Sequence, residues 1–205
     1  SGMSTIYRES FHLTVDKLYF PMVKPYFDHP PVFGLLVGSF AVLSGQLSFD
    51  QIQLSTIRMV PIFLSIISSL LLFLIGNRLY GFKVGIWTIL IYTTVTIFIV
   101  NQRIVVAESL VTTLLLASLY LTLLFPKKVP YKVAVLAGVL CGLSFLSKIL
   151  GIVTFFTVFY LFAAQKVPRR IMLIFTTVFG MFVFGFIAYG RYYGWEQFVT
   201  VQAYQ

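Results

Sequence analysis

The sequence contains few charged residues and very few acids. Only 10% of its 205 residues are charged, and just six are Asp or Glu, whereas about 25% of an average soluble domain is charged. Hydrophobic residues make up 59% of the chain. This composition excludes a water-soluble enzyme and a disordered region, and it predicts a polytopic membrane protein. The net charge of +9 does not indicate a nucleic-acid partner, because the cations punctuate apolar runs and form no polar basic surface.

The sequence contains a single cysteine, and its opening residues lack the features of a secretion signal. The single cysteine, Cys141, lies in an apolar run and has no second cysteine with which to form an intrachain disulfide. The opening residues Ser1, Gly2 and Met3 are followed by neither a basic segment nor an apolar segment of the kind that a signal peptide needs. The sequence reads as a segment of a longer protein. Alternatively, Met3 could be a start residue behind a Ser-Gly cloning remnant.

Long apolar runs are frequent. A helix needs about 20 apolar residues to cross about 30 Å of hydrocarbon. The run 33–47 is too short for a comfortable crossing and suits an interfacial helix after an outer loop at 1–32. The sequence therefore predicts an all-α polytopic membrane protein with about six transmembrane helices within 57–190, and 191–205 begins the next outer loop. The six predicted spans are 57–76, 84–100, 104–125, 131–147, 149–164 and 171–190.

Charge distribution predicts the orientation. If the six spans alternate, three loops on one side hold eight of the fifteen Lys and Arg residues and no acid. This side is expected to be cytoplasmic by the positive-inside rule. All six acids fall on the opposite, extracytoplasmic side if 33–47 does not cross, although the charge rule alone mildly favours a crossing. The eight cations are Arg78, Lys83, Lys127, Lys128, Lys132, Lys166, Arg169 and Arg170.

The string Asp28-His29-Pro30-Pro31 is the most informative local motif. Two consecutive prolines hold the backbone extended and stiff. A carboxylate and an imidazole side by side at a membrane interface could act as a general base or bind a divalent metal. An ordinary proline-stiffened loop entering a helix is the alternative, and the string alone favours it.

Ionisable residues at the predicted outer helix ends are further candidates. Glu108 lies four residues inside its span, where a charged side chain costs about 2.5–3.5 kcal/mol, so it should face protein or a cavity and have a partner. Arg103 and Lys148 are the nearest candidate partners, and such cations could also bind a lipid phosphate. The alternatives are a structural ion pair between helices and, for Arg58, a cation that merely snorkels to the interface.

Several strings in the same order resemble the GT-C superfamily of integral-membrane glycosyltransferases. The resemblance is closest to the protein O-mannosyltransferases and the lipid A aminoarabinose transferases, and it covers roughly residues 7–165. The strings that carry it are PYFDHPP at 25–31, Gly45 after the short helix, STIR at 55–58 with GNRLYG at 76–81, QR at 102–103 with Glu108, and AGVLCGLSFLSK at 137–148.

The resemblance implies an activity and a site. The donor would be a sugar on a polyprenyl phosphate, such as dolichyl-phosphate-mannose. The sugar would pass with inversion to a hydroxyl of a protein or lipid on the extracytoplasmic face of a membrane, most plausibly a prokaryotic plasma membrane. Asp28, His29 and Glu108 become the catalytic candidates, with Asp28 and His29 also able to hold a divalent metal. The donor-phosphate candidates are Arg58, Arg103 and Lys148.

The sequence departs from the family pattern at its start. The family's usual acidic base precedes the His-Pro-Pro string by some twenty to thirty residues, and this position falls at or before Ser1. The first span and the later spans of the family are also absent. We therefore expect a chain truncated at both ends, which could be inactive by itself.

Two non-enzymatic functions remain as alternatives. A transporter would place polar groups near the middle of the membrane, but here the mid-span regions hold only Ser, Thr, Gly and aromatic residues. A structural assembly subunit would not need the pair Asp28 and His29, or Lys148. Binding of a polyprenyl phosphate would separate the enzyme from both.

Overall fold

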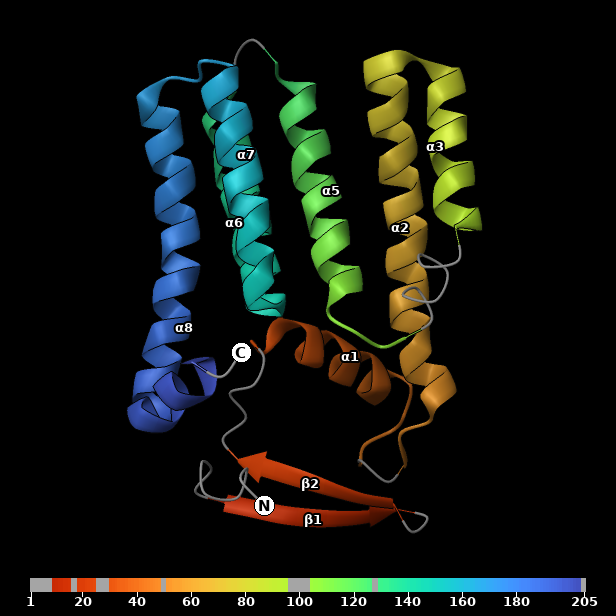
Figure 1. The fold of residues 1–205 in the computed structure, drawn as a ribbon, viewed down its shortest axis with the longest axis vertical. Helices are drawn as coiled ribbons and strands as arrows, with labels where there is room; N and C mark the ends of the chain where they lie inside the picture. Colours follow the sequence, from red (N-terminus) through yellow and green to blue (C-terminus); the bar gives the residue numbers. More distant parts are fainter. Residues whose placement is uncertain are drawn as a thin grey trace.

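The fold, taken from a computed structural model, is a bundle of helices with a short helix across one end and a β-hairpin beyond it (Figure 1). The structure describes residues 9–15, 18–24, 30–48, 51–95, 104–126 and 129–203. Their elements are β1 (Glu9–Val15), β2 (Leu18–Lys24), α1 (Val32–Leu43), α2 (Leu54–Tyr80), α3 (Phe82–Thr94), α5 (Glu108–Leu124), α6 (Tyr131–Ser147), the short 3-10 helix η3 (Ile149–Gly151), α7 (Ile152–Ala164) and α8 (Arg169–Ala203).

Each predicted span contains a helix, and successive helices run in opposite directions (Figure 1). Two of them, α2 and α8, are long and apolar enough to cross a membrane. At a rise of about 1.5 Å per residue, the 27 residues of α2 reach about 40 Å. The other four bundle helices have 13 to 17 residues each. The helical bundle is therefore confirmed, and six crossings stay a prediction.

Helix α6 lies at the centre of the bundle because its small residues allow α8 to approach closely. A Cβ atom on Gly138 would come within 2.9 Å of the backbone oxygen of Phe175, and one on Gly142 would come within 2.3 Å of the Phe182 ring. Cys141, between them, is fully buried. Small residues at such a contact let two apolar helices gain van der Waals packing inside a membrane, where hydrophobic burial supplies little.

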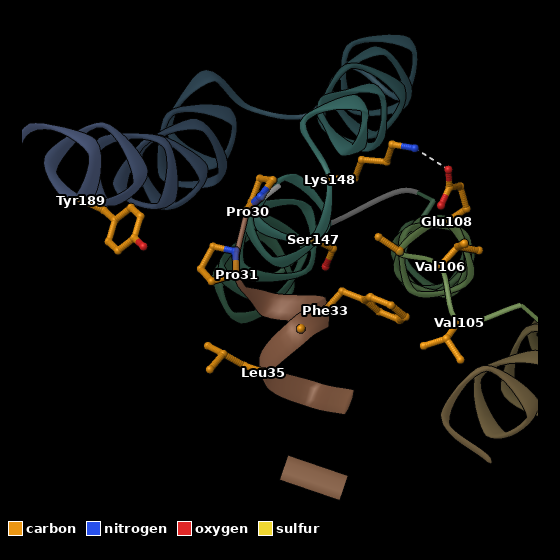
Figure 2. Close-up of a pocket in the computed structure, with 12 residues that line it drawn as sticks. Pro30, Pro31, Phe33, Leu35, Val105, Val106, Glu108, Ser147, Lys148 and Tyr189 are labelled. Carbon is orange, nitrogen blue, oxygen red and sulfur yellow. Dashed lines mark hydrogen bonds and ion pairs between the residues drawn. The ribbon is translucent and has the colours of Figure 1, made fainter. Parts of the chain in front are cut away.

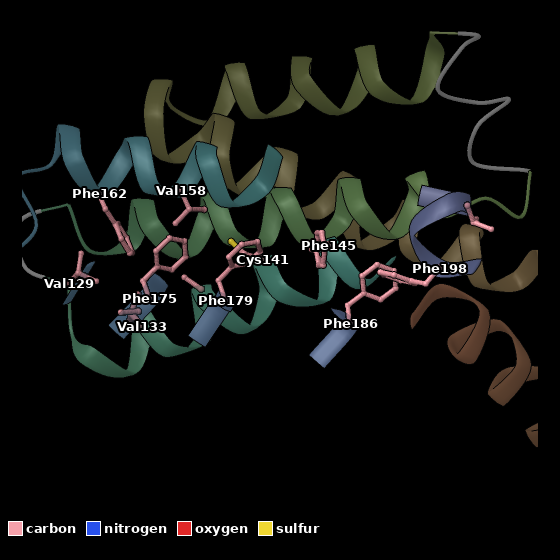
Figure 3. Close-up of a cluster of buried hydrophobic side chains, with 13 residues drawn as sticks. Val129, Val133, Cys141, Phe145, Val158, Phe162, Phe175, Phe179, Phe186 and Phe198 are labelled. Atoms are coloured by element: carbon pink, nitrogen blue, oxygen red, sulfur yellow. The ribbon is translucent and has the colours of Figure 1, made fainter. Parts of the chain in front are cut away.

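Aromatic rings fill the space between α6, α7 and α8 (Figure 3). Phe155 of α7 stacks on Phe179 of α8 with ring centroids 4.3 Å apart. Phe145 of α6 contacts the edge of Phe186 on α8 at 5.8 Å. These rings join the last three helices into one packed unit.

Helix α8 extends beyond its predicted end. The predicted span ends at residue 190, but the helix continues to Ala203 after a kink at Gly194, where the backbone is non-helical (φ 152°). The position of 191–205 outside the membrane stays a prediction. Past the kink, Phe198 packs on Phe186 at 5.1 Å and against Gly190, where a Cβ would lie 2.4 Å from the Phe198 ring. Burial of this phenylalanine holds the end of α8 against its own preceding turns.

The prediction of an all-α chain is wrong in one respect, because β1 and β2 form an antiparallel hairpin inside the expected outer loop 1–32. Their register runs from the pair Glu9–Lys24 to the pair Val15–Leu18. The sequence of β1, ESFHLTV, alternates apolar and polar residues and is rich in residues that favour strands. This alternation with a period of two is the sequence signal from which the strand could have been predicted.

Helix α1 lies across the end of the bundle and covers α2 and α5 (Figure 1). Phe40 of α1 contacts Phe63 of α2 with ring centroids 6.4 Å apart, and Leu43 remains exposed. The helix ends at Ser44 and Gly45, whose φ of +82° suits glycine at the end of a helix. Its 12 residues reach only about 18 Å, so its length agrees with the expected interfacial helix at 33–47.

Candidate functional site

The two ends of the bundle differ in charge. The end with the α2–α3, α5–α6 and α7–α8 connections carries cations and no acid among its described residues. The end covered by α1 holds both carboxylates of the described helices, Glu108 and Glu196, together with Arg58, Lys148 and Arg191. Among the described helices, chemistry that needs a carboxylate is therefore confined to the α1 end.

A cavity of about 500 Å³ opens at this end (Figure 2). Ligand pockets commonly have volumes of about 300–1,000 Å³, so the cavity has the size of a small-molecule site. Its walls are contributed by the start of α1, the segment before α5, the end of α6 and α8. The lining residues are Pro30, Pro31, Phe33, Gly34, Leu35, Val105, Val106, Ala107, Glu108, Ser147, Lys148 and Tyr189.

An ion pair joins two helix ends at the wall of this cavity. The Nζ atom of Lys148 donates a hydrogen bond to Oε1 of Glu108 (Figure 2). Glu108 is the first residue of α5, and Lys148 directly follows α6. Because a helix carries partial positive charge at its start and partial negative charge at its end, both ions are favourably placed.

The ion pair confirms one prediction and corrects another. Lys148 had been predicted as a candidate partner of Glu108, and it is the partner found. Glu108 had been placed four residues inside a span, but residues 104–107 are not helical, so it begins its helix. Its side chain is 52% exposed and that of Lys148 is 27% exposed. Neither ion is buried in an apolar core.

A tight turn between α6 and α7 positions Lys148. Its carbonyl accepts a hydrogen bond from the amide of Gly151 at 2.7 Å. Below the turn, the buried hydroxyls of Ser144 and Thr154 are hydrogen-bonded at 2.9 Å and join the two helices. Gly151 lies so close to α6 that a Cβ there would be 2.1 Å from the Ser144 carbonyl oxygen. The backbone of Lys148 is thus fixed while its side chain reaches along the cavity wall.

Two polar residues of the cavity escaped the sequence analysis. The hydroxyl of Ser147 is fully buried and donates to the carbonyl of Leu143 at 2.7 Å. Tyr189 faces the cavity from α8, across from the ion pair (Figure 2). Ser147 could have been suspected from its place next to Lys148. Tyr189 gave no signal, because its place depends on how α8 packs.

The other predicted site residues are not gathered at the cavity by the described structure. Arg58 is exposed on α2 and does not line the cavity. Asp28, His29 and Arg103 lie outside the described residues. Pro30, which directly follows His29 in the sequence, is part of the cavity wall.

No group of three His, Cys, Asp or Glu residues gathers anywhere in the described part of the chain. Within it, the cavity offers one carboxylate, and that carboxylate is paired with a lysine. Divalent metals such as Mg²⁺ and Ca²⁺ prefer several oxygen ligands. The described lining residues by themselves therefore do not make a metal site.

Long apolar helices, two of them of membrane-spanning length, with a charged cavity at one end of the bundle are typical of an integral-membrane protein. Residues 28–189 match the family of dolichyl-phosphate-mannose-protein mannosyltransferases, and the chain belongs to this family. This result confirms the resemblance to GT-C glycosyltransferases. Neither curated proteins nor solved structures gave a match.

Proposed function

We propose that the protein is a glycosyltransferase that uses a polyprenyl-phosphate sugar as its donor and a hydroxyl of a protein or lipid as its acceptor. The reaction would take place in the cavity at the α1 end of the bundle, on the extracytoplasmic face. One observation supports the proposal above all: the residues that match the family line a cavity, and its wall holds a lysine and a carboxylate in contact.

Lys148 suits the donor phosphate. When the bond between the sugar and the phosphate breaks, a second negative charge develops on the leaving polyprenyl phosphate. A fixed ammonium group at that place stabilises the transition state more than the bound donor. The nearby walls contributed by Phe33, Val105 and Val106 are apolar and suit the first isoprene units of the lipid.

A carboxylate would complete the reaction. The acceptor oxygen attacks the anomeric carbon from the face opposite the phosphate, the bond to the phosphate oxygen breaks, and its electron pair leaves with the phosphate. The proton of the acceptor hydroxyl passes to a carboxylate acting as general base. Glu108 is the carboxylate in the described cavity wall. Asp28 and His29 remain candidates because they immediately precede Pro30 in the sequence.

Arg58 and Arg103 would help to bind the lipid phosphate of the donor at the membrane interface. A transporter is less well supported, because the cavity is lined by residues at the α1 end of the bundle, whereas transporters bind substrate near the middle of the membrane.

A transfer assay tests the function. We expect the purified protein, reconstituted in lipid, to release polyprenyl monophosphate from polyprenyl-phosphate-mannose when a hydroxyl-bearing peptide or lipid is added. Labelled mannose should appear on the acceptor. No release with any acceptor would contradict the proposal. The same assay with EDTA tests whether Asp28 and His29 hold a divalent metal. Loss of transfer that Mg²⁺ or Mn²⁺ restores would support such a metal. An unchanged rate would contradict it.

Orientation can be tested separately by cysteine labelling. Tyr192, exposed on α8 at the cavity end, and Lys166, in the α7–α8 connection at the opposite end, are each replaced by cysteine. In intact cells, a membrane-impermeant maleimide should label Tyr192→Cys and leave Lys166→Cys unlabelled until the cells are opened. The native Cys141 is fully buried and serves as the unlabelled background. The reverse pattern would overturn the assigned orientation.

A further inference from the structure

The ion pair at the cavity wall occupies the cation that a donor phosphate would need. We propose that Glu108 and Lys148 form an exchangeable latch: the donor phosphate replaces Glu108 as the partner of Lys148, and the displaced carboxylate becomes available to the acceptor hydroxyl. This inference rests on the proposed function and adds an order of events to it.

The residues that line the cavity make the donor phosphate and Glu108 competitors for Lys148. Among its described lining residues, Lys148 is the cation and Glu108 is the carboxylate. The two side chains are in direct contact. A phosphate entering the cavity therefore meets a lysine that is already neutralised, together with a carboxylate that repels it. The ammonium group has three N–H donors, but a phosphate and a carboxylate that share it repel each other, so displacement of Glu108 is favoured over a shared lysine.

The exchange needs only side-chain rotation. The backbone of Lys148 is held by the hydrogen bond to Gly151, and the pair Ser144–Thr154 fixes the helices behind it. The side chains of Glu108 and Lys148 are partly exposed and each has several rotatable bonds. An exposed ion pair typically changes the equilibrium constant for forming it by no more than about fivefold. Such a pair is weak enough for a phosphate to replace.

The exchange would also order the reaction. While Lys148 holds Glu108, the carboxylate oxygen that accepts the lysine hydrogen bond is not available as a proton acceptor. Once the phosphate takes over Lys148, Glu108 can turn to the acceptor hydroxyl. The acceptor would then be activated mainly when the donor is in place, which limits the loss of the sugar by transfer to water.

Donor-product binding tests the latch. The probe is a polyprenyl monophosphate without a sugar, titrated into the full chain in detergent micelles. We expect Glu108→Gln to bind it roughly fivefold more tightly than the unmodified protein, because the competing carboxylate is gone while an amide of the same size remains. Glu108→Asp, with a shorter carboxylate, should fall between the two. The matched control is Glu196→Gln, which removes an exposed carboxylate at the same end of the bundle but outside the cavity and should leave the affinity unchanged.

A second comparison distinguishes exchange from simple repulsion. In a protein that already carries Lys148→Met, Glu108→Gln should bring a clearly smaller gain in affinity, because only the repulsion between carboxylate and phosphate is then relieved. A gain of the same size would overturn the latch, as would unchanged or weaker binding by Glu108→Gln alone, since weaker binding means that Glu108 only orients the lysine. These three results leave the proposed function standing. If the unmodified protein binds no polyprenyl monophosphate, both the latch and the proposed function fail. Thermal unfolding of each variant checks that it is folded.

Discussion

Replacing Lys148 with methionine is expected to reduce sugar transfer by at least about a hundredfold, the usual effect of removing one group that stabilises developing charge. Methionine keeps much of the length and the apolar stem but removes the ammonium group. Because the lysine acts mainly as the phosphate leaves, most of the loss should appear in kcat. The measurement is the initial rate of mannose transfer from polyprenyl-phosphate-mannose at several donor concentrations.

Two further variants make this result specific. Lys148→Arg keeps the positive charge and should retain a measurable part of the activity, although its planar head cannot occupy the same position as an ammonium group. Lys132→Met removes an exposed lysine from the opposite end of the same helix and should leave the transfer rate unchanged. Equal losses in Lys148→Met and Lys132→Met would mean that net charge matters and that the cavity does not hold the donor phosphate.

The helical part of the fold could be predicted from the sequence because each helix of the bundle contains a long, mainly apolar run. The predicted span 131–147 coincides with α6. The close contact at Gly138 and Gly142 also has a local sequence signal, because small residues four positions apart lie on one helix face. These features depend on residues close together in the chain.

Other parts of the fold depend on contacts that the sequence pattern does not reveal. The helix beyond Gly194 is held by Phe198, which packs on Phe186, and no local signal marks that partner. The start of α5 was placed too early because residues 104–107 are apolar without being helical. A run of apolar residues shows that a segment is buried or in lipid, but it does not fix where its helix begins.

The candidate site could be predicted only in part. Glu108 and Lys148 stood out because charges are rare in apolar runs, and a charge at membrane depth needs a partner. Their pairing follows from the alternation of helices, which brings the start of α5 and the end of α6 to the same end of the bundle. The cavity itself could not be foreseen, because it forms where α1 crosses that end (Figure 2). Its shape depends on the angle between α1 and the bundle.

The turn that carries Lys148 leads to the second large expected effect. Gly151→Ala should destabilise the protein by about 1–3 kcal/mol, the usual cost of overpacking, and lower the rate of sugar transfer at least tenfold. The backbone of Gly151 has an ordinary helical conformation (φ −61°), so the turn does not need glycine for its dihedral angles. It needs glycine because a Cβ would lie 2.1 Å from the Ser144 carbonyl oxygen and 2.8 Å from the amide nitrogen of Phe145. These are backbone atoms of α6, so α6 and the turn must move apart.

Movement of the turn would displace Lys148 by a fraction of an ångström or more, and a shift of about 1 Å can cost a hundredfold in rate. The effect is measured as the unfolding temperature in detergent, the affinity for polyprenyl monophosphate and the transfer rate. The control is Gly185→Ala on α8, where no atom lies within 4 Å of the added Cβ. Because alanine favours a helix over glycine by up to about 1 kcal/mol, this control should be as stable as the unmodified protein or slightly more so. If Gly151→Ala unfolds at a lower temperature but binds donor and transfers sugar normally, the turn serves packing alone, and the position of Lys148 does not govern the reaction.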